Sequence, residues 1–184
     1  QEKGIFILLE AFKNLKIKRE LHLWGGYVEQ GSAIDVAIRH LSTQMPLYYH
    51  GAYDHMNLEK VFQSFDICIV PSIWEETYGL VIQEALAAKK IVIASEIGGM
   101  KERIVSGVNG FLVPPGDVKA LAEKMGEVAL NFEELRKKLD FGKGQLSIED
   151  DSKWHEEFYD WTVRNWGALK AKKSLPVDYV PQPH

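Results

Sequence analysis

The chain has 184 residues, 46% of them hydrophobic, which fits one domain with a substantial core and excludes a disordered protein. Its 22 basic and 26 acidic side chains are interspersed and give a net charge of −4, so nucleic acid is not an expected partner. No apolar stretch approaches the roughly 20 residues that span a bilayer, and no signal peptide opens the sequence, so we expect a cytoplasmic protein. Cys68 is the only cysteine, which excludes disulfides within the chain and cysteine-based metal sites; we interpret it as a core residue.

Strands alternate with helices along the chain. Ile5, Leu8 and Phe12 have helical spacing, and a doubly wound domain would place a strand before such a helix, so we expect a fragment with a truncated first strand. Further strands are predicted at residues 20–24, 47–50, 66–70, 91–94 and 110–113. Further helices are predicted at residues 32–43, 57–64, 79–88, 100–106, 117–130 and 132–139. This alternation predicts right-handed βαβ units and an α/β fold with a Rossmann-like parallel sheet and helices on both faces.

The sequence predicts that the chain has three parts. We expect residues 1–145 to form the Rossmann-like domain, residues 146–170 to hold an aromatic-rich helix that packs on it, and residues 171–184 to be a tail or linker. The aromatic residues of that helix are Trp154, Phe158, Trp161 and Trp166. A helix this apolar requires a surface to dock on.

The most informative segment lies between the strand at 66–70 and the helix at 79–88. It places Glu76 before the turn Tyr78-Gly79-Leu80 and Glu84 on the helix that follows. Free N–H groups and the dipole at a helix N-terminus attract phosphate, and carboxylates beside them accept hydrogen bonds from hydroxyls. Ligands of such sheets bind at the carboxyl ends of the strands, where this loop lies. The segment therefore predicts a site for a nucleotide sugar, which carries both phosphates and hydroxyls.

Motifs spread over residues 3–130 match one family. The chain resembles the C-terminal, nucleotide-sugar-binding domain of the family 4 (group 1) retaining glycosyltransferases, which have the GT-B fold. The matching pieces are Lys3-Gly4-Ile5, residues 8–12, Gly51, residues 66–72, residues 76–80, Glu84-Ala85, Gly98-Gly99 with Glu102, and residues 107–114. Their order along the chain makes the match specific, whereas a lone Glu-x7-Glu spacing would be a weak signal.

The resemblance implies roles for the residues of the central segment. Glu76 would contact hydroxyls of the donor sugar, and Glu84 would bind the ribose hydroxyls of the nucleotide. Thr77 and the turn Tyr78, Gly79 and Leu80 would bind the donor, with the amides of the turn facing the sugar and the diphosphate. The sequence does not identify the nucleotide, so the donor is a UDP-, GDP- or ADP-sugar.

The resemblance also implies donor contacts outside that segment. Lys3 would clamp the diphosphate together with an arginine that precedes residue 1. Gly51 and Tyr53 belong to the loop that would approach the nucleotide base. Gly25 and Gly26 correspond to a glycine turn after the second strand of the family domain.

The chemistry of sugar transfer explains why these residue types are needed. Positive charge develops at the anomeric carbon and negative charge on the departing diphosphate. Lys3 would stabilise the diphosphate and Glu76 would position the sugar, so both are catalytic candidates. We expect no metal and no cofactor, and because retention in the family is explained by attack on the face from which the leaving group departs, we nominate no covalent nucleophile. The implied partners are the donor and an N-terminal acceptor-binding domain of the same full-length protein, without which the chain should be inactive.

The sequence departs from the family pattern after the helix at 79–88. Relatives carry Gly at the position of Lys89 and Pro at the position of Ile91. A left-handed C-cap without Gly costs on the order of 1 kcal/mol, which a folded domain tolerates.

Two other functions stay open. The chain could be a non-catalytic nucleotide-binding or interaction module of the same fold, in which Glu76 only favours the helix N-terminus and Glu84 is an exposed helix residue. A glycoside hydrolase would instead use Glu76 and Glu84 as a facing pair, about 5 to 9.5 Å apart. The separation of eight residues turns the two carboxylates roughly 80° apart on a helix, which disfavours that pairing. The full-length protein would be cytoplasmic, or peripheral at the inner membrane face.

Overall fold

A computed structural model describes residues 3–15, 17, 19–26, 28–53, 57–75 and 79–143, together with Glu156, Asp160, Val163 and Arg164. The chain divides into two units, residues 1–144 and 145–184, and those four isolated residues are the described part of the second. The four aromatic residues predicted for the C-terminal helix, and the tail at 171–184, lie outside the described residues. No described helix has the length and apolar character needed to cross a bilayer.

Helices and strands alternate along the first unit as the sequence predicts. The strands are β1 (Leu21–Trp24), β2 (Leu47–Gly51), β3 (Ile67–Val70), β4 (Ile91–Ser95) and β5 (Phe111–Val113). The helices are α1 (Ile5–Lys13), α2 (Ala33–Ser42), α3 (Leu58–Gln63), α4 (Leu80–Ala87), α5 (Met100–Arg103), α6 (Val118–Leu130) and α7 (Phe132–Lys138). The α/β class is therefore confirmed, and the predicted helices and strands of this unit are present.

The largest difference in element ends is at α5, which was expected to continue to residue 106. It ends at Arg103, and Ile104 is extended with φ −104° and ψ 118°. The buried side chain of Asn109 accepts a hydrogen bond from the Val105 N–H (2.8 Å) and donates one to the Arg103 carbonyl (2.8 Å). These bonds compete with continuation of the helical ladder, so a residue distant in the loop ends the helix.

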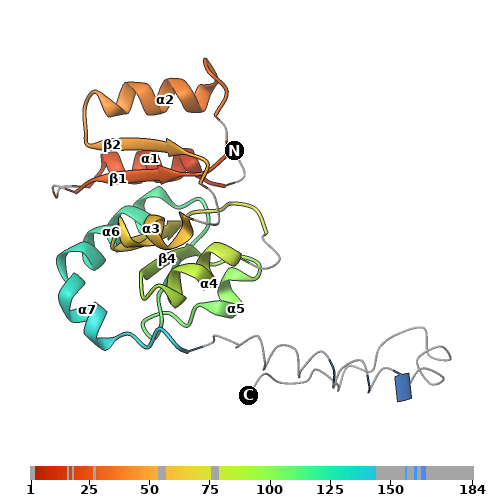
Figure 1. The fold of residues 1–184 in the computed structure, drawn as a ribbon. Coiled ribbons are helices and arrows are strands. Elements are labelled where there is room, and N and C mark those ends of the chain that lie inside the picture. Colours follow the sequence, from red (N-terminus) through yellow and green to blue (C-terminus); the bar gives the residue numbers. More distant parts are fainter. Residues whose placement is uncertain are drawn as a thin grey trace. The chain divides into compact units, whose positions relative to one another are not determined.

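The strands form two parallel sheets instead of the single sheet expected. β1 pairs with β2, and β3, β4 and β5 pair in that order. β1 and β3 each lie at the edge of their own sheet, and no described strand joins them. Figure 1 shows the β1–β2 pair at one end of the unit, with α4 and α5 at the other.

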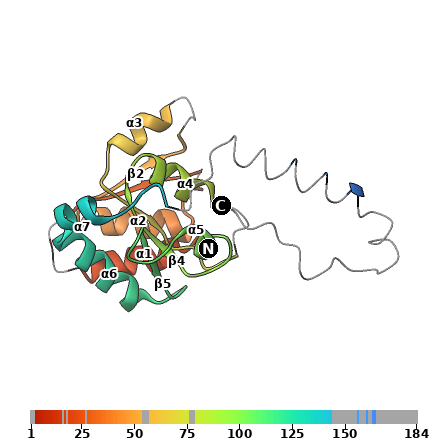
Figure 2. The same ribbon diagram turned by 90° about the horizontal axis from the view of Figure 1, so that it is seen from below.

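Helices cover both faces of the strands. α1 contacts α2 and α6, and these three helices contribute to one core cluster; α1 and α6 lie side by side in Figure 2. α4 and α5 pack together on the other cluster, to which α3 contributes Phe62. Side chains of β4 alternate between the two clusters, Ile91 and Ile93 to the first and Val92 and Ala94 to the second. This is the pattern of a strand buried between two helical layers.

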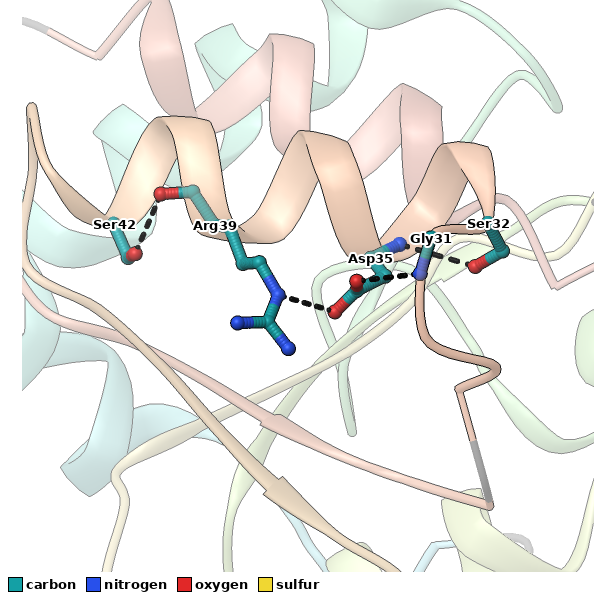
Figure 3. A network of polar contacts seen from close by, with 5 residues as sticks. All are labelled: Gly31, Ser32, Asp35, Arg39 and Ser42. Atoms are coloured by element: carbon teal, nitrogen blue, oxygen red, sulfur yellow. Dashed lines mark hydrogen bonds and ion pairs between the residues drawn. The ribbon is translucent and has the colours of Figure 1, made fainter.

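The start of α2 is encoded locally (Figure 3). Ser32 Oγ accepts a hydrogen bond from the Asp35 N–H at 3.2 Å, and the Asp35 carboxylate accepts one from the Gly31 N–H at 2.8 Å. Arg39 Nε donates to the same carboxylate at 2.8 Å. The Gly31 bond, followed by the Arg39 bond, lowers the pKa of Asp35. These contacts satisfy N–H groups that the helix itself leaves without partners.

The end of α4 contains the left-handed residue expected at Lys89. Its φ is 55°, the sole positive φ of a non-glycine residue in the described part of the chain. The Lys89 N–H donates to the Leu86 carbonyl and the Lys90 N–H to the Ala85 carbonyl, both at 2.9 Å. This pair of bonds defines a Schellman motif, in which glycine is the favoured residue at the position of Lys89.

Candidate functional site

The loop between β3 and α4 leaves the sheet at its carboxyl edge. Pro71 and Ser72 follow β3 and are buried, and Ser72 Oγ donates a hydrogen bond to the Trp74 carbonyl at 3.1 Å. Glu76, Thr77 and Tyr78 lie outside the described residues, so their roles stay predictions. The distance between the carboxylates of residues 76 and 84 is likewise untested, and the hydrolase alternative stays open at this point.

Gly79 starts α4 in a conformation that favours glycine. It has φ 65° and ψ 47°, and an added Cβ would be in ordinary contact with Ile82 Cδ1 at 3.6 Å. The backbone angle, not lack of space, therefore selects glycine here. The first turn of α4 has no acidic residue, and no described side chain caps it. In the first turn the Ile82 N–H donates to the Gly79 carbonyl at 2.9 Å, which leaves the N–H groups of Leu80 and Val81 for an anionic ligand.

Glu84 on α4 and Tyr53 after β2 lie close enough to interact electrostatically. Burial first, and then the Glu84 carboxylate, raise the pKa of the Tyr53 hydroxyl. The same two causes raise the pKa of Cys68 to about 12, so this buried thiol is a core residue and not a nucleophile. Glu84 thus influences Tyr53, but it lines a second, smaller cavity and not the one that Tyr53 lines.

The residues that lead into α1 lie against the loop after β3. Gly4 has φ 70°, and an added Cβ would be 1.7 Å from the Pro71 carbonyl oxygen. Only glycine permits this approach, and it brings the adjacent Lys3 to the same edge of the sheets. Lys3 is exposed there and lines a cavity that Pro71 and Ser72 also line.

The glycines after β1 and β2 are joined by hydrogen bonds. The Gly25 N–H donates to the Gly51 carbonyl at 3.0 Å, and the Tyr49 hydroxyl donates to the Gly26 carbonyl at 2.6 Å. Gly51 has φ 73°, while an added Cβ at Gly25 or Gly26 would meet no atom within 4 Å. Gly25, Gly26, Tyr53 and Lys3 line the same cavity of about 1030 Å³.

Trp24 is a site residue that sequence reasoning missed. Its ring stacks on His50 with centroids 4.1 Å apart and meets Tyr53 edge-on at 6.4 Å. Its Nε1 is buried and has no hydrogen-bond partner among the described residues. A signal was present, because Trp24 ends β1 directly before Gly25-Gly26, at the edge where ligands bind. The indole adds a flat aromatic wall and an unused N–H donor to this edge.

No group of three or more His, Cys, Asp and Glu side chains with the arrangement of a metal site occurs among the described residues. His22 Nδ1 and His50 Nε2 lie 2.8 Å apart, and His22 Nε2 lies 3.3 Å from Glu20 Oε2. Burial first, and then His22, lower the pKa of His50. The described edge therefore offers amides, one lysine and aromatic rings to a ligand.

The chain is similar to known proteins in sequence and in fold. The sequence matches the family described as glycosyl transferases group 1 over residues 1–141. It is 31% identical over 174 residues to an uncharacterized glycosyltransferase of Methanocaldococcus jannaschii, which covers 95% of this chain and 45% of that protein. The chain thus spans less than half the length of this relative.

The chain is also similar to solved crystal structures, among them those of a Rickettsia glycosyltransferase and of Anabaena HepE. A glycosyltransferase from Rickettsia africae superposes with a TM-score of 0.68 at 30% identity, over 76% of this chain and 38% of the other. Anabaena HepE, solved in complex with UDP and glucose, superposes with a TM-score of 0.66 at 24% identity, over 76% and 42%. The second likeness concerns the fold alone. Because the family match covers 141 of the 184 residues, the chain belongs to the glycosyl transferases group 1 family.

Proposed function

We propose that this chain is the C-terminal donor-binding domain of a retaining family 4 glycosyltransferase and binds a nucleoside diphosphate sugar. The observation that carries the proposal is one cavity that Lys3, Tyr53 and Val81 of the first turn of α4 line together, with Glu84 close enough to Tyr53 to raise its pKa. Cation and amides suit a diphosphate, and a carboxylate beside an aromatic ring suits a nucleoside. The likeness in fold to Anabaena HepE, whose structure contains UDP and glucose, supports this assignment.

In the reaction we propose, the bond between the anomeric carbon and the diphosphate oxygen breaks, and its electron pair stays on the diphosphate. The α4 amides and Lys3 stabilise that charge without a metal ion or a cofactor. The acceptor hydroxyl forms the new bond on the same face and loses its proton to the departing phosphate oxygen. Glu76 holds sugar hydroxyls away from the reacting bond, which positions the anomeric carbon.

The acceptor site belongs, in this proposal, to an N-terminal domain of a longer protein. The chain covers only 45% of its Methanocaldococcus relative and 38% of the Rickettsia structure, so both have room for such a domain. The chain by itself would then bind a donor without transferring sugar. A cytoplasmic location, or a peripheral one at the inner membrane face, is part of the same proposal.

Calorimetric titration with UDP, GDP and ADP tests donor binding. We expect one of the three to bind, and Glu84→Gln to weaken it by about tenfold or more, since hydrogen bonds to charged groups contribute about 1.5–3 kcal/mol. Glu133→Gln is the matched control, because Glu133 is an exposed acid on α7 and should leave affinity unchanged. No binding of any nucleotide would contradict the proposal. Binding that Glu84→Gln leaves unchanged would contradict the role of Glu84.

The alternative of a non-catalytic module makes a different prediction. If the alternative holds, the longer protein binds the same nucleotide but does not transfer sugar, so no nucleotide is released from a nucleotide sugar when acceptors are present. Measuring nucleotide release by the longer protein, with Glu76→Gln as the comparison, separates the two. We expect release that the substitution strongly reduces.

A further inference from the structure

We propose that Glu20, His22 and His50 form a hydrogen-bonded row that positions Trp24 and Tyr53 at the carboxyl edge of the β1–β2 pair. In this proposal His50 is a positioning residue for the nucleobase of the donor, because it acts through Trp24 and does not touch the ligand itself. The inference rests on the proposed function and adds the residues that hold the base end of the site.

The first observation is a hydrogen bond in the plane of two imidazole rings. His22 Nδ1 and His50 Nε2 lie 2.8 Å apart, the two ring planes differ by 3°, and the ring centroids are 5.1 Å apart. The facing nitrogens therefore lie on the line between the rings, which is the geometry of a good hydrogen bond. The second nitrogen of His22, Nε2, lies 3.3 Å from Glu20 Oε2. The three side chains thus form one continuous row.

Glu20 determines where the protons of this row lie. A carboxylate only accepts hydrogen bonds, so the proton of His22 lies on Nε2 and His22 Nδ1 is an acceptor. The proton between the rings therefore belongs to His50 Nε2. This arrangement requires two neutral imidazoles, and burial first, and then His22, lower the pKa of His50 and favour its neutral form.

The second observation is an irregular register that brings His50 beside Trp24. Leu23 pairs with Tyr49 and Trp24 pairs with Gly51, so His50 is an extra residue of β2 that lies opposite no residue of β1. Such bulges change the direction of a side chain and are frequent next to functional sites. The His50 ring stacks on the Trp24 ring, with centroids 4.1 Å apart and planes 13° apart. The row from Glu20 therefore ends against the indole.

The third observation connects the indole to the candidate site. Trp24 meets Tyr53 edge-on with centroids 6.4 Å apart, and both residues line the cavity of about 1030 Å³. Gly25 lines it as well, and an added Cβ there would meet no atom within 4 Å, so a ligand can approach the backbone. His50 is not among the described residues that line this cavity. A ring that is held in place before binding loses less conformational entropy when a nucleobase packs on it.

Other titratable groups lie around the row. Tyr48 on β2 packs against His22, with ring centroids 5.0 Å apart. The helix α2, which contacts β2, carries Asp35, Arg39 and His40. The groups that share the cavity with His22 are Lys3, Arg19, Glu20, Tyr53 and Asp66. A pH dependence of binding is therefore assigned to His50 only where a substitution of His50 removes it.

Calorimetric titration with ligands that have and lack a base tests the role of His50. The ligands are whichever of UDP, GDP and ADP binds, and inorganic pyrophosphate. His50→Phe keeps a ring against Trp24 but removes the bond to His22. We expect it to weaken nucleotide binding by about fivefold, the factor that one hydrogen bond contributes, and to leave pyrophosphate binding unchanged. His40→Phe is the matched control, because His40 is an exposed histidine on α2.

His22→Phe breaks the same row one residue further from Trp24. We expect the same loss of nucleotide affinity, and no further loss when it is combined with His50→Phe, because both changes remove one bond. No nucleotide binding by the natural chain would contradict the proposed function and the role of His50 with it. Nucleotide binding that His50→Phe leaves unchanged, a loss that pyrophosphate shares, or losses that add in the double variant would overturn the positioning role alone.

Nuclear magnetic resonance and a pH series test the row itself. At pH 7.5 the nitrogen shifts should show the proton on Nε2 of both His22 and His50, and a proton on Nδ1 of His50 would overturn the proposal. As the pH is lowered to 5, a second proton on the pair removes the acceptor at His22 Nδ1 and breaks the bond. Nucleotide affinity relative to pyrophosphate should then fall in the natural chain and stay constant in His50→Phe. The same pH dependence in both would overturn the proposal.

Discussion

The two halves of the domain differ in how completely their strands are covered. In the β3–β4–β5 half, β4 lies between two partners and its side chains are fully buried. In the β1–β2 half, β2 has Tyr48 at 45% and Tyr49 at 37% exposure. Both halves are parallel βαβ structures, and they differ chiefly in the number of neighbours per strand. A parallel strand therefore reaches full burial only when its neighbours on both sides are present.

The largest expected difference between the halves is the loss of stability when a core isoleucine is replaced by alanine. Ile93→Ala on β4 should lower the free energy of unfolding by about 3–4 kcal/mol, because the Ile93 side chain is fully enclosed and its removal leaves a cavity. Ile69→Ala on β3 should cost about half as much, since Ile69 is only half-buried and lines the cavity of about 1030 Å³. Urea unfolding of both variants measures the difference. Equal losses would remove the distinction between the covered and the open strand.

A buried amide should have the next largest effect. Asn109 is 0% exposed and bonds the Val105 N–H, the Arg103 carbonyl and the Lys143 carbonyl. Asn109→Ala leaves these partly buried backbone groups without the partner that Asn109 supplies and should cost about 3 kcal/mol. Thermal unfolding compares it with Asn57→Ala, because the Asn57 side chain is exposed and makes no cap bond to α3. A loss no larger than that of the control would show that water replaces these bonds.

A stabilising change is expected at the end of α4. Lys89→Gly should raise the free energy of unfolding by about 1 kcal/mol, since glycine adopts φ 55° without the Cβ penalty. Ala88→Gly is the matched control, and it should destabilise because residue 88 has φ −78°. Chemical denaturation of both variants gives the signs. A loss of stability in Lys89→Gly would mean that the Lys89 side chain contributes more than its backbone strain costs.

The smallest effect should appear as a pH dependence of the β1–β2 half. In the folded chain the pKa of His50 lies below its ordinary value of 6.5, first through burial and then through His22. The unfolded chain therefore binds more protons in the window between the lowered pKa and 6.5, and stability falls as the pH is lowered through that window. Unfolding measured from pH 7.5 to 5 should show a shallower dependence in His50→Gln than in the natural chain. Identical slopes would exclude His50 as a cause.

Much of the fold follows from local signals. The alternation of strands and helices and the left-handed residue at Lys89 were predicted and are present, and the side chains of Ser32 and Asp117 cap the helices that follow them. Each depends on interactions within a few residues, which a sequence pattern displays directly.

Other features depend on residues that are distant along the chain. The early end of α5 requires Asn109, whose side chain returns to Arg103 and Val105. The approach of Gly4 to Pro71 and the stacking of Trp24 on His50 join separate elements. The sequence pattern does not predict these contacts, because the packing of the layers determines which distant residues meet.

The sequence by itself determined the α/β class and the order of the elements, and it indicated which residues belong near a nucleotide sugar. Interactions between residues close in the sequence were sufficient to predict the fold class and the order of the elements. The candidate residues followed from the resemblance of the motifs to the family. Only the tertiary structure decided that Lys3 and Tyr53, from separate parts of the chain, line one cavity, and that β1 and β3 have open edges facing it. Both findings are relations between distant segments, and such relations exist only once the helical layers have packed around the strands.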